Sequence, residues 1–206
     1  MQEIYIIKRQ ITWLDGILKL FNYLITVIFF SIPISFSHAS DRWVLDKSLS
    51  TIEFELPVLF AKNVKGTFNT IEGFVELDVI KKENNKAIFS VQIDNLEMNY
   101  IKYKDLLLSN IFFDTKKFPL AVIDTKKFSY DNEKKLKLDA ELTLKGKSEI
   151  VPLVINVTRL AEELVQIQSE LVFSRTSFEI GIGQWSNTSI LKDKIKIKTN
   201  LFLFKE

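Results

Sequence analysis

Residues 43–78 read WVLDKSLSTIEFELPVLFAKNVKGTFNTIEGFVELD, and this stretch carries the strongest β-strand signals of the chain. Ile52 and Phe54 alternate with glutamates, a two-residue period that predicts a β-strand with one apolar face. Because proline has no N–H to donate to a strand ladder, Pro57 is expected to end this strand. The following part predicts a second strand, bent or interrupted near Gly73. Such a bend serves a barrel and a sandwich equally well.

The rest of the chain predicts strands joined by polar turns. Further strands are expected at residues 87–93, 120–124, 135–144, 150–157, 164–174 and 194–204. Pro152 favours an edge position or a bulge in its strand. Residues 99–110 lose the alternation and predict a short helix, with Asp94, Asn95 or Asn99 as its N-terminal cap. The pattern indicates a single all-β domain of about eight antiparallel strands with one short helical insertion.

Residues 1–39 are typical of a signal peptide. Basic residues precede a nearly uncharged apolar run at 20–36, and Ser37 and Ala39 have the small side chains that signal peptidase requires. We expect cleavage after Ala39 and a periplasmic domain over residues 40–206. An uncleaved membrane anchor and a buried core helix are the alternatives.

The composition excludes several function classes. The chain of 206 residues has a net charge of +2, too weak to indicate a nucleic-acid partner. It has no cysteine, and its one histidine, His38, is lost on cleavage, which excludes thiol catalysis and a Ser-His-Asp triad. The paired carboxylates Glu53 and Glu55 lie on the expected solvent face. We therefore predict that the protein is not an enzyme and has no catalytic residue, metal site or cofactor.

Five short motifs follow one another along the predicted mature chain. They are S-x-x-x-F at 50–54, V-x-G-x-F at 64–68, F-F-D with K-F-P at 112–119, L-T-L-K-G-K-S at 142–148 and S-R-T-S-F at 174–178. In this order the chain resembles the YceI family of bacterial lipid-binding proteins. The resemblance implies an eight-stranded, lipocalin-like β-barrel whose partner is a polyisoprenoid or another long-chain lipid. Contact with a membrane surface and a homodimer are left open.

The many aromatic residues supply candidate contacts for such a ligand. A barrel interior can hold one apolar chain, because burial gains roughly 0.8 kcal/mol per methylene. The candidate lining residues lie at or beside the shared motifs and are Phe54, Leu56, Phe60, Phe68, Phe112, Phe113 and Phe178. Arg175 and Lys62 are the candidates for a polar head group. The competing interpretations are a filled interior, a structural ion pair for Arg175 and a solvated charge for Lys62.

Departures from the family's pattern bear on the head group. Val58 stands where relatives usually have a histidine, and Leu106 and Leu108 stand where they usually have polar residues. Because leucine cannot donate a hydrogen bond, we expect the tail to dominate affinity and the head group to stay partly solvated. The predicted function is lipid transport or storage. The alternative is a structural or stress-related interaction protein with a filled barrel.

Overall fold

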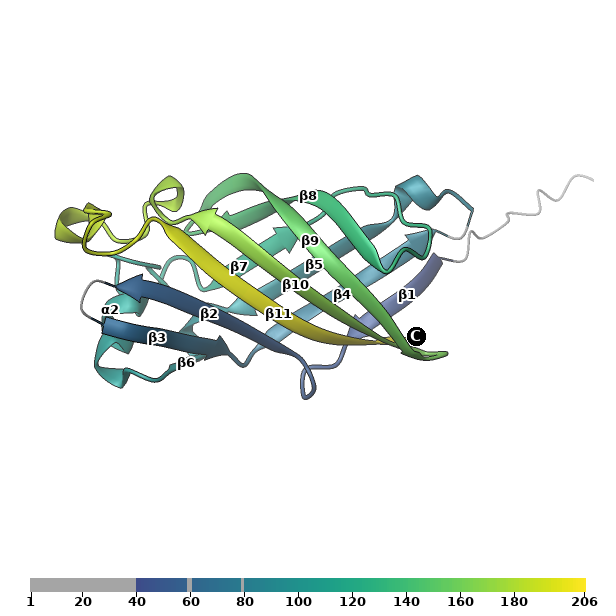
Figure 1. The fold of residues 1–206 in the computed structure, drawn as a ribbon, viewed down its shortest axis with the longest axis horizontal. Helices are drawn as coiled ribbons and strands as arrows, with labels where there is room; N and C mark the ends of the chain where they lie inside the picture. The colour runs from purple at the N-terminus through teal and green to yellow at the C-terminus, as the bar shows by residue number, and fades with distance from the viewer. Residues whose placement is uncertain (1–39, 59–60, 79) are drawn as a thin grey trace, which may run out of the picture. The chain divides into compact units, whose positions relative to one another are not determined.

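The computed structural model describes residues 40–58, 61–78 and 80–206, so the predicted signal segment lies outside the described residues. The described chain forms an antiparallel β-barrel with one short α-helix (Figure 1). Its strands are β1 (Ser40–Leu45), β2 (Thr51–Val58), β3 (Ala61–Phe68), β4 (Ile71–Asp78), β5 (Lys86–Gln92), β6 (Leu96–Met98), β7 (Leu120–Asp124), β8 (Lys135–Leu144), β9 (Lys147–Ala161), β10 (Leu164–Ser174) and β11 (Lys194–Lys205).

Eight long strands make the barrel, and three of them are broken. β2 continues the path of β1 along β11, β3 leads into β4, and β5 leads into β6. The ring closes because β1 pairs with β4 on one side and with β11 on the other. Within the described residues, this architecture confirms the predicted eight-stranded antiparallel barrel.

Hydrogen bonds hold the break between β1 and β2. The carboxylate of Asp46 accepts from the backbone N–H groups of Ser48 (2.8 Å) and Leu49 (3.0 Å), which closes a turn. On β11, the carbonyl of Phe202 accepts from the backbone N–H of Asp46 (2.8 Å), and its N–H donates to Ser50 Oγ (2.9 Å). β11 therefore keeps its hydrogen bonds across the gap between the two short strands.

Two positions expected to interrupt strands lie inside them. The expected interruption of the second long strand is present, but it lies at 69–70, between β3 and β4, and Gly73 itself lies inside β4. Gly73 faces Phe89 across the β4–β5 ladder, and a Cβ there would lie 2.2 Å from Cδ1 of Phe89. The glycine therefore makes room for an aromatic ring. β2 also continues past Pro57, at an irregularity in its pairing with β3, where proline is tolerated.

The barrel has two partly unpaired stretches. β10 pairs with β9 from Val154 onwards, so β8 is the one described strand beside Pro152, and the expected edge position is confirmed. β7 pairs with β8 over 122–124 and 141–143. Residues 135–140 of β8 therefore have β9 as their one partner among the described strands.

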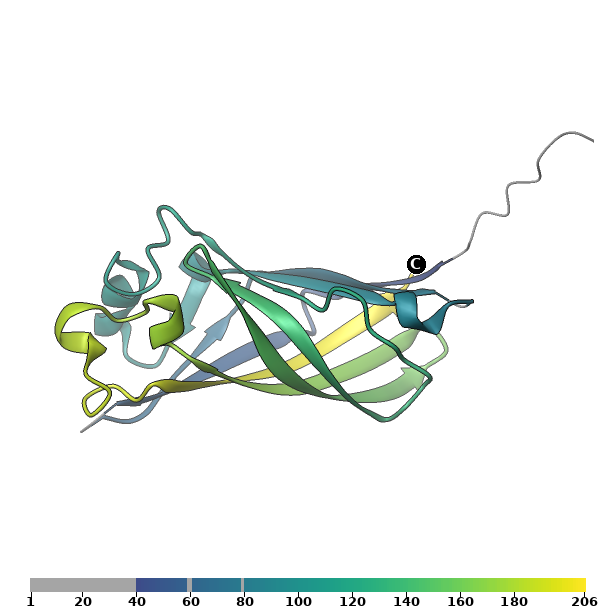
Figure 2. The same ribbon diagram turned by 90° about the horizontal axis from the view of Figure 1, so that it is seen from above.

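One end of the barrel, which we call the α2 end, has the helix α2 (Lys104–Leu108) and the loop 175–193 (Figures 1 and 2). The predicted helix is present, but its predicted caps are wrong. The side chain of Asn95 donates to Thr70 Oγ1 (2.9 Å), and Asn99 Oδ1 accepts from the backbone N–H of Lys65 (3.0 Å). Both side chains therefore tie the approach to the helix to the neighbouring long strand.

The opposite end, which we call the C-terminal end, has the chain terminus, the connection 125–134 and the β9–β10 turn (Figure 1). Within the described residues, no helix combines the length and the apolar character needed to span a membrane.

Candidate functional site

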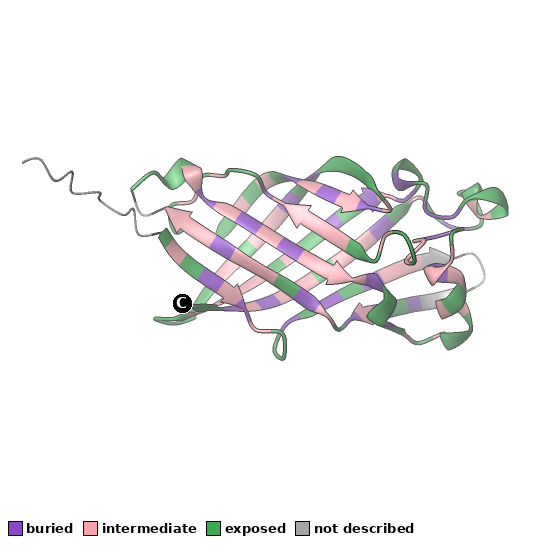
Figure 3. Cartoon of the chain, turned by 180° about the vertical axis from the view of Figure 1, so that it is seen from behind, coloured by how far each residue is buried: buried purple, intermediate pink, exposed green. Residues whose placement is uncertain are grey.

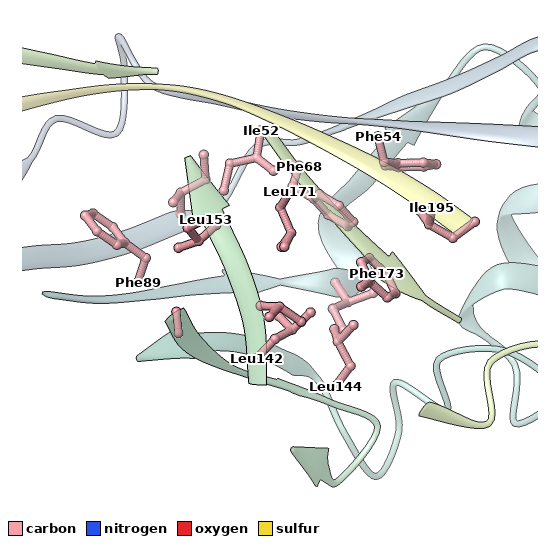
Figure 4. Packing of buried hydrophobic residues seen from close by; sticks show 14 of the residues in the cluster. Ile52, Phe54, Phe68, Phe89, Leu142, Leu144, Leu153, Leu171, Phe173 and Ile195 are labelled. Atoms are coloured by element: carbon pink, nitrogen blue, oxygen red, sulfur yellow. The ribbon is translucent and has the colours of Figure 1, made fainter. Parts of the chain in front are cut away.

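Buried and more exposed residues alternate along the strands of the barrel (Figure 3). The interior is apolar because most of the buried residues are hydrophobic. Figure 4 shows side chains such as Phe89, Leu142 and Phe173 inside the barrel, each from a different strand. A core of this kind is expected wherever a sheet closes on itself. The described side chains do not fill it completely.

Two cavities lie in this lumen. A wide cavity of about 640 Å³ occupies the half nearest the C-terminal end, and a narrow one of about 120 Å³ lies towards the α2 end. Both are lined by Ile52, Phe89, Ile123, Leu171, Ile197 and Thr199. Because they share these walls, we treat them as one lumen with a constriction. The wide cavity alone is within the size range of small-molecule sites, roughly 300–1,000 Å³.

The wide cavity has an apolar wall with a few polar atoms. Ser169 and Thr199 face each other across the β10–β11 ladder, and their hydroxyl oxygens lie 2.7 Å apart in a hydrogen bond. Thr125 Oγ1 accepts from the backbone N–H of Ala87 (2.9 Å). These polar atoms are satisfied by the protein itself. The buried indole Nε1 of Trp43, also on the wall, has no hydrogen-bond partner among the described residues.

The wide cavity reaches the surface at the C-terminal end. Its exposed polar lining residues, which we call the rim, are Asn132, Glu133, Lys134, Thr158 and Arg159. Tyr130 lies half-buried beside the rim. Burial, helped by the negative charge of Glu133, raises the pKa of Tyr130, so its hydroxyl is a neutral hydrogen-bond donor at neutral pH.

Six phenylalanine rings line the narrow cavity among aliphatic side chains. Phe54 lies opposite Gly66 on β3, where a Cβ would come within 2.3 Å of the Phe54 ring. The rings of Phe54 and Phe68 lie 5.3 Å apart, and Phe112 contacts Trp185 with ring centroids 5.8 Å apart. The absence of a side chain at position 66 thus makes room for the ring of Phe54.

Buried residues line the narrow cavity towards the α2 end. Leu107, Phe112, Ile180 and Leu191 all line it, and all are buried. Arg175 is the one charged residue among the described lining, and it is 1% exposed. Among the described residues, the lining at this end of the lumen is therefore mostly apolar and buried, whereas the rim is polar and exposed.

Each nitrogen of the Arg175 guanidinium donates to a backbone carbonyl. Nη1 donates to Ile180 (2.8 Å), Nη2 to Leu191 (2.7 Å) and Nε to Lys192 (3.0 Å). Burial lowers the pKa of Arg175 from its ordinary value, and the nearby carboxylate of Asp193 opposes this effect. The side chain thus holds the loop 175–193 over the barrel end, through carbonyls rather than through the ion pair considered as an alternative.

Most of the predicted lining residues come together in the narrow half. Phe54, Leu56, Phe68, Phe112 and Phe113 line the narrow cavity. Phe178 is buried outside both cavities and packs edge-on against Phe173, with centroids 5.5 Å apart. Phe60 and the side chain of Lys62 lie outside the described part of the chain. The ligand-binding roles of all these residues stay predictions.

None of the lining residues proposed from the sequence lies on the described wall of the wide cavity. Its walls include Trp43, Leu138, Leu153 and Leu201, and its rim includes Arg159. The alternation in residues 135–144 and 194–204 was a usable signal, because it placed Leu138 and Leu201 on the apolar faces of their strands. The candidates instead followed the shared motifs, which gather near the α2 end. Among the described residues, no group of histidine or acidic side chains is arranged to hold a metal ion.

The sequence and the fold of this chain are similar to those of known proteins. The model of the YceI-like domain family matches residues 43–203. BcnA of Burkholderia cenocepacia has a similar structure, with a TM-score of 0.69 and 23% identity, covering 77% of this chain and 98% of that chain. A polyisoprenoid binding domain from Saccharophagus degradans, implicated in plant cell wall breakdown, gives 0.65 and 15%, covering 80% of this chain and 98% of that chain.

The YCEI protein of Campylobacter jejuni has a TM-score of 0.60 and 22% identity, covering 73% of this chain and 89% of that chain. These likenesses show a shared fold. A search of curated proteins gave no match.

Proposed function

The chain belongs to the YceI-like domain family, and from this we propose that it binds a long apolar lipid of polyisoprenoid type in the barrel lumen. The observation that carries the proposal is the lumen itself, with a wide cavity of about 640 Å³ that continues towards a narrow one. The similar fold of the polyisoprenoid binding domain from Saccharophagus degradans supports this class of ligand.

The energetics favour a long tail. Burial of about ten methylene-sized groups gains on the order of 8 kcal/mol, whereas three such groups gain about 2 kcal/mol. Association costs at least about 4 kcal/mol in lost translational and rotational freedom. Short chains therefore do not repay that cost in an apolar lumen, and long chains do.

We further propose that the protein carries or stores this lipid in the periplasm after cleavage of residues 1–39, and that it performs no catalysis. The alternative is an interaction protein with a filled barrel. The wide cavity favours the lipid-binding role, because a filled barrel would leave no space of this size.

Extraction of the purified protein with organic solvent tests the proposal. Mass spectrometry of the extract should identify a long apolar chain in near-stoichiometric amount, and protein treated in the same way after delipidation should release none. An extract without lipid, together with no binding of added polyprenol by the delipidated protein, would rule out the lipid-binding role.

A further inference from the structure

The two ends of the lumen differ in exposure and in polarity. At the α2 end, the described lining residues Leu107, Phe112 and Leu191 are buried and apolar. At the C-terminal end, the five residues of the rim are polar and exposed. A head group at the α2 end would lie among these buried apolar side chains, which offer it no hydrogen bonds, whereas at the rim it would lie among polar groups in contact with water.

The charged side chains of the rim are not equally free to bind. The Arg159 guanidinium donates from Nη2 to the carbonyl of Glu162 (2.8 Å) and from Nε to that of Ala161 (3.3 Å), which fixes its position beside the β9–β10 turn. The carboxylate of Glu133 accepts from the backbone N–H of Asp131 (2.8 Å). The ammonium of Lys134 has no hydrogen-bond or ion-pair partner among the described residues.

Tyr130 adds an uncharged donor at the same place. It lies half-buried on the cavity wall, and its hydroxyl has no hydrogen-bond partner among the described residues. Lys134, Arg159 and Tyr130 thus offer N–H and O–H groups, and such donors are satisfied by oxygen acceptors, most strongly by anionic ones. At the α2 end, in contrast, the donors of Arg175 are already taken by carbonyls.

We propose that the lipid lies with its tail towards the α2 end and its head group at the rim, where Lys134, Arg159 and Tyr130 favour an anionic oxygen head group. This inference rests on the proposed lipid-binding function. It reverses the orientation expected from the candidates Arg175 and Lys62. Because the rim is exposed, the head group stays partly solvated and the discrimination between head groups is modest.

Position-specific quenching tests the orientation. Since the chain has no natural cysteine, Asn132→Cys at the rim and Ile101→Cys at the α2 end each provide one site for a fluorophore. The probes are two stearic acids, one with a nitroxide near the carboxylate and one with a nitroxide near the methyl end. The carboxylate-proximal nitroxide should quench the Asn132→Cys label more strongly, and the order should be reversed for the Ile101→Cys label.

The opposite order at both labels would overturn the orientation, and so would equal quenching by the two probes at both labels. An absence of any quenching at either label would show that no lipid enters the lumen. That result would remove the proposed function and the orientation together, so the two failures can be told apart.

A charge reversal tests the head-group chemistry, with farnesyl phosphate and farnesol as probes that share one tail. Lys134→Glu should weaken the binding of farnesyl phosphate by about five- to tenfold, as expected for loss of an exposed ion pair and gain of a repulsion. Its affinity for farnesol should change less than about twofold, because a neutral head group forms no ion pair. The matched control Lys102→Glu makes the same charge change at the α2 end and should affect neither probe.

Equal losses with both probes, or a larger loss from Lys102→Glu, would contradict the assignment of the head group to the rim. A carboxylate probe with the same tail distinguishes the two kinds of anion. If Lys134→Glu weakens the binding of farnesoic acid and of farnesyl phosphate by the same factor, the rim recognises negative charge rather than phosphate in particular, and the proposal stands for both.

Discussion

The guanidinium of Arg175 stabilises the loop 175–193 through hydrogen bonds rather than through an ion pair. Each of its three nitrogens donates to a backbone carbonyl of the loop 175–193, and the side chain is almost completely buried. A hydrophobic replacement would leave those carbonyls buried without donors. Such an orphaned acceptor costs about 1–3 kcal/mol.

We therefore predict that Arg175→Leu lowers the free energy of unfolding by about 3 kcal/mol, because several carbonyls lose their donor at once. Urea denaturation followed by circular dichroism measures this loss. The matched control, Lys102→Leu, removes an exposed cation at the same end and should change stability by less than about 0.5 kcal/mol. A stable Arg175→Leu protein that binds farnesol but loses farnesyl phosphate would instead assign Arg175 to the head group.

Part of the site was visible at the level of residues. Phe54 and Phe112 belong to recognisable motifs, and both line the lumen. The partners of Arg175 could not be inferred, because they are backbone carbonyls whose positions depend on how the loop folds. The wide cavity was also beyond sequence analysis. Alternation shows that Leu138 faces inwards, but the space left in front of it depends on the radius of the closed ring.

At the scale of elements, the loop 175–193 depends on one carboxylate where it joins β10 and β11. Asp193 accepts hydrogen bonds from Ser174 Oγ (2.8 Å) and Thr176 Oγ1 (2.6 Å). Burial alone would raise the pKa of Asp193, but these hydrogen bonds and one from the backbone of Thr176 outweigh it and hold the pKa below its usual value. The ionised form is therefore the one that the folded protein stabilises.

The sign of this shift gives a pH dependence. Because the folded-state pKa is lowered, the stabilisation is complete above the unfolded-state pKa of about 4 and is lost as the pH falls through the folded-state value. We predict that Asp193→Asn is less stable than the parent protein at neutral pH and loses less stability on acidification. Urea denaturation at a series of pH values compares the two slopes, with Asp139→Asn on an exposed face as the control. Identical acid slopes in the parent and Asp193→Asn would contradict this role.

The strands themselves were largely predictable, and their breaks were not. The boundaries of β8 and β10 agree with the alternation, because each has one face inside the barrel and one outside it. The break between β1 and β2 depends on Ser50, whose hydroxyl replaces a strand partner for Phe202 on β11. Because this hydrogen bond joins residues far apart in the chain, no local sequence pattern predicts it. The break expected near Gly73 lies at 69–70 instead, and the glycine itself is explained by the ring of Phe89 on the next strand, which no local pattern shows.

For the molecule as a whole, the described residues give the lumen an apolar, buried lining at the α2 end and a polar, exposed rim at the other. Arg175 and aromatic rings line the lumen towards the α2 end, and the connection 125–134 and the β9–β10 turn lie around the rim at the other. The apolar lumen between them gives the fold a place for a lipid tail, and the rim gives it a place for a head group. Lipid binding by this barrel therefore requires that the wide cavity take up the tail.

The most direct measurement is the binding of farnesol to delipidated protein whose wide cavity has been filled. Leu138 lines that cavity, whereas its neighbour Lys137 is exposed on the outer face of β8, so Leu138→Trp and Lys137→Trp add the same ring inside and outside the barrel. We predict that Leu138→Trp weakens binding at least about tenfold, a loss of about 1.4 kcal/mol, and that Lys137→Trp leaves it unchanged. Equal affinity of the two folded variants for farnesol would contradict the account.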